Sequence, residues 1–165
     1  MNSSNSFEAK LSIEFAFFAV CRITTTSPDM ETGHNGTGFL MCINHAQENT
    51  RLLVVTNKHV VSDPTYHVAI SLNGRDGNGS VELGSRVSAS IVNFHRTYMA
   101  HPEEDLALID ITETPFSPSG PYVKYFDSAD ILLDADKLWP GMDIMYIGYP
   151  DGRFDTYNNL PLEVI

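Results

Sequence analysis

Residues 52–61 read Leu-Leu-Val-Val-Thr-Asn-Lys-His-Val-Val, and the fold of the chain is best read outward from this stretch. Four consecutive apolar residues bounded by polar turn formers are typical of a strand that is buried on both faces. A short barrel provides such an environment. The stretch therefore predicts a buried strand that ends near Thr56, with His59 just beyond it, where an imidazole is held still and can reach a cleft.

Two further stretches change the interpretation of His59, because a lone histidine at a strand end is more often structural than catalytic. Gly-Thr-Gly-Phe-Leu at 36–40 lies upstream, and Asp-Leu-Ala-Leu-Ile at 105–109 lies downstream. With Thr-Asn-Lys-His-Val, they make residues 15–150 resemble the trypsin-like (chymotrypsin-fold) serine peptidases, especially the bacterial branch. The resemblance implies that His59 is the general base and that Asp105 orients it. The interval between the two is close to the about 45 residues of the best-known triad of this family.

The serine nucleophile that this family requires is not found after Asp105, where no Gly-x-Ser-Gly stretch occurs before Ile165. Ser119 only superficially mimics a nucleophile, because it lies in a proline-rich loop of the first barrel, whereas the family's serine comes from the second. By the resemblance, the chain is expected to be an N-terminal fragment of a serine endopeptidase that acts on protein or peptide substrates. Its expected partner is the missing C-terminal half, which would supply the serine, the oxyanion hole and the specificity pocket. The chain alone is expected to be inactive.

The rest of the chain reads as short strands with polar connections. Strands are expected at residues 17–26, 36–43, 51–56, 66–72, 81–92 and 105–111, while residues 7–20 are also compatible with a short helix. This spacing predicts an all-β barrel or sandwich, and the resemblance selects a six-stranded Greek-key barrel for residues 1–126. Residues 127–138 have helical character, and the resemblance makes 127–140 the crossover to a second barrel. Residues 141–165 would then hold the first strand or strands of that incomplete barrel.

The alternation of side chains along residues 105–109 bears on the environment of Asp105. Asp105, Ala107 and Ile109 would share one face of a strand whose other face is also apolar, so Asp105 is expected to begin a buried strand. A buried carboxylate is costly unless it has a partner, and a neighbouring imidazole N–H is an adequate one. The alternative is that Asp105 only caps a backbone turn.

Composition argues against several classes of function. The 165 residues are 42% apolar, which is enough for one folded domain. The net charge of −11 argues against binding to nucleic acid or to an anionic membrane surface. No apolar run approaches the about 18 residues of a transmembrane helix, and residues 11–20 lack the flanks of a signal peptide, so a cytoplasmic location is expected.

Neither a cofactor nor a metal is expected. Cys21 and Cys42 lack metal-site spacing and are expected to be buried free thiols, although a hairpin could bring them together. None of the six histidines has a recognised zinc spacing. In the polar cluster at 101–105, Pro102 prevents a regular helix. Residues 74–79 read as a turn, because no Gly-Lys-Ser/Thr ending makes them a phosphate loop.

A function of a different class stays open, namely a non-catalytic protein-binding domain with a trypsin-like barrel. Barrels of this fold can lose catalysis and keep a groove. The presence of both His59 and Asp105 weighs against this alternative. The serine loop separates the two functions, because an enzyme needs it and a binding module does not.

Overall fold

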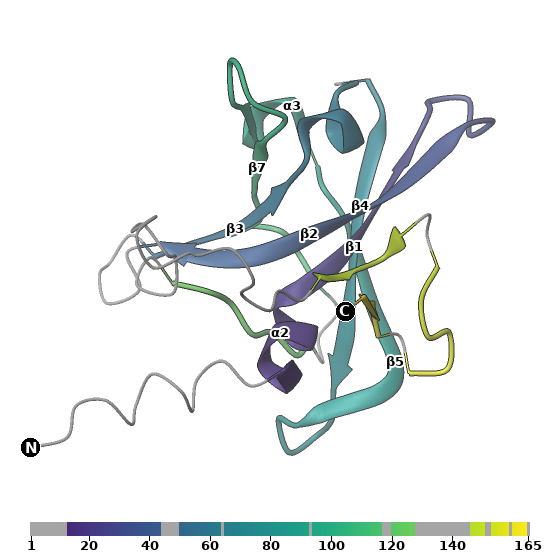
Figure 1. The fold of residues 1–165 in the computed structure, drawn as a ribbon, viewed down its shortest axis with the longest axis vertical. Helices are drawn as coiled ribbons and strands as arrows, with labels where there is room; N and C mark the ends of the chain where they lie inside the picture. The colour runs from purple at the N-terminus through teal and green to yellow at the C-terminus, as the bar shows by residue number, and fades with distance from the viewer. Residues whose placement is uncertain are drawn as a thin grey trace, which may run out of the picture.

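The computed structural model describes residues 13–43, 50–63, 65–92, 94–116, 120–127, 146–150, 153–158 and 160–164. Its elements, in chain order, are α2 (Ile13–Ala19), β1 (Val20–Thr26), β2 (Gly33–Ile43), β3 (Arg51–Thr56), the 3₁₀ turn η1 (Lys58–Val61), β4 (His67–Arg75), β5 (Val81–Ser90), α3 (Phe94–Thr97), β6 (Tyr98–Ala100), β7 (Ala107–Asp110), β8 (Tyr146–Gly148) and β9 (Leu162–Val164) (Figure 1). The predicted all-β class is confirmed.

The strands form one large antiparallel sheet and one small ribbon. In the part of the chain that the structure describes, seven strands follow the order β5-β4-β1-β2-β3-β7-β6, and β8 pairs only with β9. Within the described ranges, β5 and β6 are the two edges of an open sheet. The hydrogen-bond pairing therefore does not by itself establish the expected closed barrel.

The strand predicted in residues 52–61 is buried as expected. β3 lies between β2 and β7, and its last four residues, Leu53 to Thr56, are all buried. β1 instead alternates, with Cys21, Ile23 and Thr25 buried and their neighbours half-buried. A strand in mid-sheet with cover on both faces needs apolar residues at consecutive positions, which is the pattern that β3 shows.

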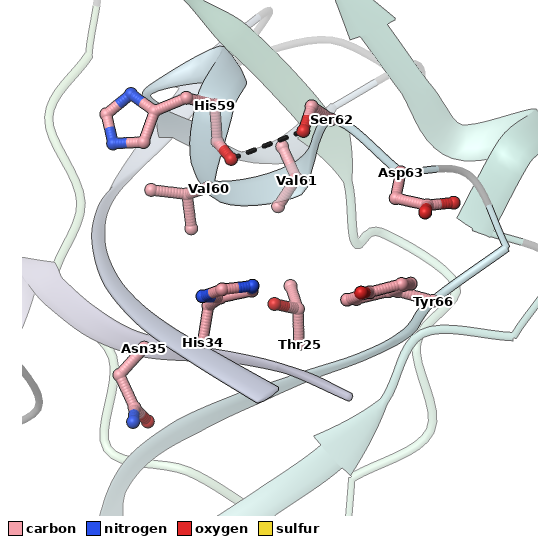
Figure 2. Close-up of a pocket in the computed structure, with 9 residues that line it drawn as sticks. All are labelled: Thr25, His34, Asn35, His59, Val60, Val61, Ser62, Asp63 and Tyr66. Atoms are coloured by element: carbon pink, nitrogen blue, oxygen red, sulfur yellow. Dashed lines mark hydrogen bonds between the residues drawn. The ribbon is translucent and has the colours of Figure 1, made fainter. Parts of the chain in front are cut away.

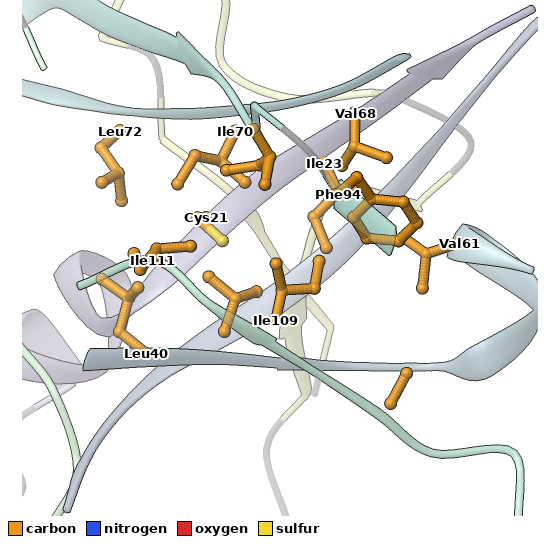
Figure 3. Close-up of a cluster of buried hydrophobic side chains, with 13 residues drawn as sticks. Cys21, Ile23, Leu40, Val61, Val68, Ile70, Leu72, Phe94, Ile109 and Ile111 are labelled. Atoms are coloured by element: carbon orange, nitrogen blue, oxygen red, sulfur yellow. The ribbon is translucent and has the colours of Figure 1, made fainter. Parts of the chain in front are cut away.

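The hydrophobic core fills the inner face of the large sheet (Figure 3). Its members are Cys21, Ile23, Leu40, Val54, Val61, Val68, Ile70, Leu72, Ile91, Phe94, Ala107, Ile109 and Ile111. Cys21 and Cys42 are buried free thiols, as expected. They do not face each other, because Cys21 is paired with Gly38 and Cys42 with Leu52. Burial raises the pKa of the Cys21 thiol to about 12, so this group stays protonated.

Several predicted boundaries were wrong. Residues 13–19 are helical, so the first strand begins at Val20. The short strand β6 is not among the expected strands, and it forms because Met99 pairs with Leu108 at the sheet edge. Residues 128–145, with most of the expected helix and crossover, lie outside the described residues, as does Ser119.

Candidate functional site

The candidate site lies where β3 and β7 lie side by side. Thr56, the last residue of β3, pairs with Ala107, the first residue of β7. The chain just after β3 and the chain just before β7 are therefore neighbours. His59 lies in the first of these segments and Asp105 in the second, so the sheet register brings together two residues that are far apart in the sequence.

His59 is carried by η1, which starts at Lys58, two residues after the end of β3. η1 packs directly on β2. A Cβ at Gly36 would collide with both methyl groups of Val60, and Val61 is buried in the core. The absence of a side chain at Gly36 therefore lets η1, the turn that holds His59, pack against β2.

The structure brings His59 and Asp105 into direct contact through two hydrogen bonds. The imidazole Nδ1 lies 2.6 Å from Asp105 Oδ2, and the main-chain N–H of His59 donates to Oδ1 at 2.9 Å. An ionised carboxylate can only accept, so Nδ1 carries a proton, and in the neutral imidazole Nε2 then keeps a lone pair. An imidazole in this tautomer is suited to act as a general base.

Asp105 is held in its charged form. The main-chain N–H of His59, followed by the imidazole, holds the pKa of this carboxyl below its ordinary value. The side-chain amide of Asn57 also donates to Asp105, at 3.2 Å to Oδ2 and at 3.2 Å to the main-chain oxygen. The carboxylate is thus ionised at neutral pH and fixed from two directions.

The prediction that Asp105 begins a buried strand was wrong. β7 begins two residues later, at Ala107. The side chain of Asp105 is 49% exposed and that of His59 is 72% exposed. The reason is that the main-chain N–H of His101 donates to the carbonyl of Leu106 at 2.8 Å, which closes a loop in front of the strand. Exposed ion pairs contribute little to folding, so this pair adds little to the stability of the fold.

The loop before Asp105 is fixed by groups that the sequence analysis did not assign. His101 Nδ1 accepts the main-chain N–H of Glu104 at 2.9 Å, and Lys58 Nζ donates to the His101 carbonyl at 3.1 Å. Three consecutive residues, Asn57, Lys58 and His59, therefore all reach the same loop. Their signal in the sequence was the polar run between the buried strand and the histidine.

No family model, curated protein or solved structure matched this chain.

Function must therefore be inferred from the site itself. In the described part of the chain, no three side chains of His, Cys, Asp or Glu converge as metal ligands would. His101, from the polar cluster considered above, instead accepts hydrogen bonds from its own loop. No helix in the described ranges is long and apolar enough to cross a membrane.

A pocket of about 430 Å³ lies next to His59 (Figure 2). Its lining residues are Thr25, His34, Asn35, His59, Val60, Val61, Ser62, Asp63 and Tyr66. These residues come from the end of β1, from the start of β2, and from η1 and the segment that follows it. The candidate base therefore lies at the edge of a pocket.

The Gly-Thr-Gly stretch of β2 also anchors a distant part of the chain. Thr37 Oγ1 accepts the main-chain N–H of Tyr149 at 2.8 Å, and Tyr149 is buried. A Cβ at Gly148 would lie 2.8 Å from the same Thr37 oxygen. Gly148 and Tyr149 therefore pack on β2, the same strand on which η1 packs.

Proposed function

We propose that this chain supplies the general base and its orienting carboxylate to a serine endopeptidase that acts on proteins or peptides. The supporting observation is that Asp105 accepts both the ring N–H and the main-chain N–H of His59. This double hydrogen bond fixes the position and the tautomer of the imidazole together. Acyl transfer by a serine needs a base whose tautomer is fixed by a third group.

In this proposal His59 Nε2 takes the proton of the serine hydroxyl and returns it to the leaving amine. Asp105 holds the ring and stabilises the imidazolium that forms between the two steps. Asn57 acts as a positioning residue, because its side-chain amide donates to Asp105. The nucleophile, the oxyanion donors and the main specificity pocket are assigned to a segment that is not part of this chain.

The proposal includes a Greek-key barrel for residues 1–126. The edge strands β5 and β6 are consecutive in the chain, and Ile91 and Phe94 of their connection belong to the core. The Ile91 N–H donates to the Val68 carbonyl at 2.8 Å, which continues the β4–β5 contact beyond the end of β5. These features support a sheet that curves round its core. The β8–β9 ribbon then belongs to a second barrel, which is reached through residues 127–140.

The decisive experiment uses the complete gene product that contains this sequence, expressed through to its stop codon. It is treated with a fluorophosphonate probe that labels activated serines and is assayed on a peptide library. We expect one labelled serine outside residues 1–165, and hydrolysis that His59→Ala lowers by about 10⁴-fold or more. His95→Ala, at an exposed histidine of α3, is the matched control and should leave the rate unchanged.

Two outcomes would contradict the proposal. If the gene product shows neither a labelled serine nor hydrolysis, the chain is better assigned as a non-catalytic binding domain. If residues 1–165 alone hydrolyse peptides in a His59-dependent way, the assignment of the nucleophile to another segment is wrong.

A further inference from the structure

The pocket beside His59 has the form of a slot with two different walls. His34 and Tyr66 form one wall, with ring centroids 6.3 Å apart and planes within 7° of parallel. Figure 2 shows the two rings side by side, with Val60 and Val61 facing them from the opposite wall. An aromatic wall opposed by an apolar one is suited to a flat group that stacks on the rings.

The two ends of the slot differ in chemistry. His59 lies at one end and Asp63 at the other (Figure 2). Asp63 Oδ1 accepts the main-chain N–H of Thr65 at 2.9 Å and its hydroxyl at 2.6 Å. Among the described residues none donates to Asp63 Oδ2. A carboxylate oxygen is therefore available at the end of the slot away from the candidate base.

The aromatic wall also contains a buried hydroxyl. Thr25 is 1% exposed, and its Oγ1 has no hydrogen-bond partner among the described residues. Figure 2 shows Thr25 between His34 and Tyr66. Buried hydroxyls nearly always have a partner, so a polar group that enters the slot gains a hydrogen bond if it reaches this oxygen.

We propose that this slot binds an arginine side chain of a polypeptide substrate, with the guanidinium stacked on Tyr66 and paired with Asp63. A guanidinium is flat, stacks on aromatic rings and pairs with carboxylates, whereas an ammonium is a compact point charge. The net charge of −11 also favours a basic ligand. The proposal rests on the proposed function only in describing the polypeptide as a substrate.

The test is an NMR titration of the 165-residue chain with blocked Ala-Arg-Ala, and with the same peptide carrying citrulline or lysine in place of arginine. Citrulline keeps the flat shape and loses the charge, while lysine keeps the charge and loses the flat shape. We expect the arginine peptide to shift the amides of His34, Ser62 and Tyr66, and to bind at least about tenfold more tightly than either analogue.

Two substitutions locate the site. Asp63→Asn keeps an oxygen for the Thr65 hydrogen bonds but removes the charge, and should weaken arginine binding at least about tenfold. Asp76→Asn is the matched control. Asp76 Oδ1 likewise accepts local main-chain N–H groups, from Asn78 at 2.9 Å and Ser80 at 2.8 Å, in the β4–β5 turn. It should leave binding unchanged.

Equal affinity for the arginine and citrulline peptides would overturn this inference, as would equal losses in Asp63→Asn and Asp76→Asn. The binding assay does not depend on catalysis, so its result is separate from that of the serine-labelling experiment. Arginine binding by a gene product without hydrolysis would support the slot and contradict the peptidase proposal. Hydrolysis without arginine binding would support the peptidase proposal and contradict the slot.

Discussion

Asp105 offers both of its carboxylate oxygens to a single residue. Oδ1 accepts the main-chain N–H of His59 and Oδ2 accepts the ring N–H. Asn57 adds a third donor on the Oδ2 side. Because the pair is exposed, water competes for each of these hydrogen bonds. The position of the ring therefore depends on several hydrogen bonds acting together, and not on burial.

The first prediction concerns the tautomer of His59 in Asp105→Asn. The variant's amide oxygen must face the main-chain N–H, so its NH₂ group faces the imidazole and cannot accept the ring proton. We expect the proton to move from Nδ1 to Nε2, which removes the lone pair of the base. Nitrogen-15 NMR of the ring measures this change, with His95 as the internal control. An unchanged Nδ1–H tautomer would contradict the assigned role of Asp105.

The second prediction concerns the acidity of Asp105. Its lowered pKa depends first on the main-chain N–H of His59 and then on the imidazole. The pairing is therefore intact at neutral pH and is lost as the pH falls through this lowered pKa, below the ordinary value of about 3.9. His59→Ala removes only the imidazole, so the pKa should rise part of the way. Carbon-13 NMR of the carboxyl tests this, and a full return to the ordinary value would contradict the role of the main-chain bond.

At the scale of elements, the site depends on how closely η1 packs on β2. Gly36 allows η1 to pack this closely, because any side chain at this position would collide with Val60. Val60 is β-branched and has few rotamers with which to move aside. The Gly-Thr-Gly stretch is therefore better understood as a packing surface than as a flexible segment.

The third prediction is that Gly36→Ala displaces η1. Overpacking of this kind typically costs about 1–3 kcal/mol in the free energy of unfolding, and it should also weaken the His59–Asp105 hydrogen bond. Urea unfolding measures the first effect, and the Nδ1–H proton resonance measures the second. Gly77→Ala is the matched control, since a Cβ there meets nothing within 4 Å. If Gly36→Ala lowers the stability but leaves the Nδ1–H resonance unchanged, then the packing of η1 on β2 does not control the His59–Asp105 hydrogen bond.

At the scale of the whole molecule, two strand systems meet on β2. The β8–β9 ribbon contacts β1 and β2 through β8 (Figure 1). Just after β8, the Tyr149 N–H donates a hydrogen bond to Thr37 Oγ1 of β2 at 2.8 Å. A two-stranded ribbon is only marginally stable by itself, so this anchor should determine how long the ribbon stays docked.

The fourth prediction is that Thr37→Val loosens the ribbon without unfolding the large sheet. The substitution keeps the shape but leaves the Tyr149 N–H without its acceptor, at a cost of about 1–3 kcal/mol. Hydrogen exchange should become faster at β8 and β9 and stay unchanged at β1 and β4. Thr24→Val is the control, because among the described residues the Thr24 hydroxyl donates only to Asn35, across the β1–β2 hairpin. Uniformly faster exchange would contradict a local anchor.

The sequence by itself determined the features that depend on local pattern. Consecutive burial of β3 and the all-β class follow from apolar runs and turn residues, which report burial directly. The two buried free thiols were also predicted. His59 and Asp105 could be selected as a pair only by resemblance, because residues so far apart show no common periodicity.

Only the tertiary structure decided which groups meet. Pairing of Thr56 with Ala107 sets the segment after β3 beside the loop before β7, and that register gives Asn57 and Lys58 their contacts. The same loop turns Asp105 outward, against the prediction of a buried carboxylate. The slot needs side chains from β1, β2 and the segment after η1. Sequence patterns encode the burial of each residue, whereas contacts between distant residues depend on strand register and close packing, which no single stretch contains.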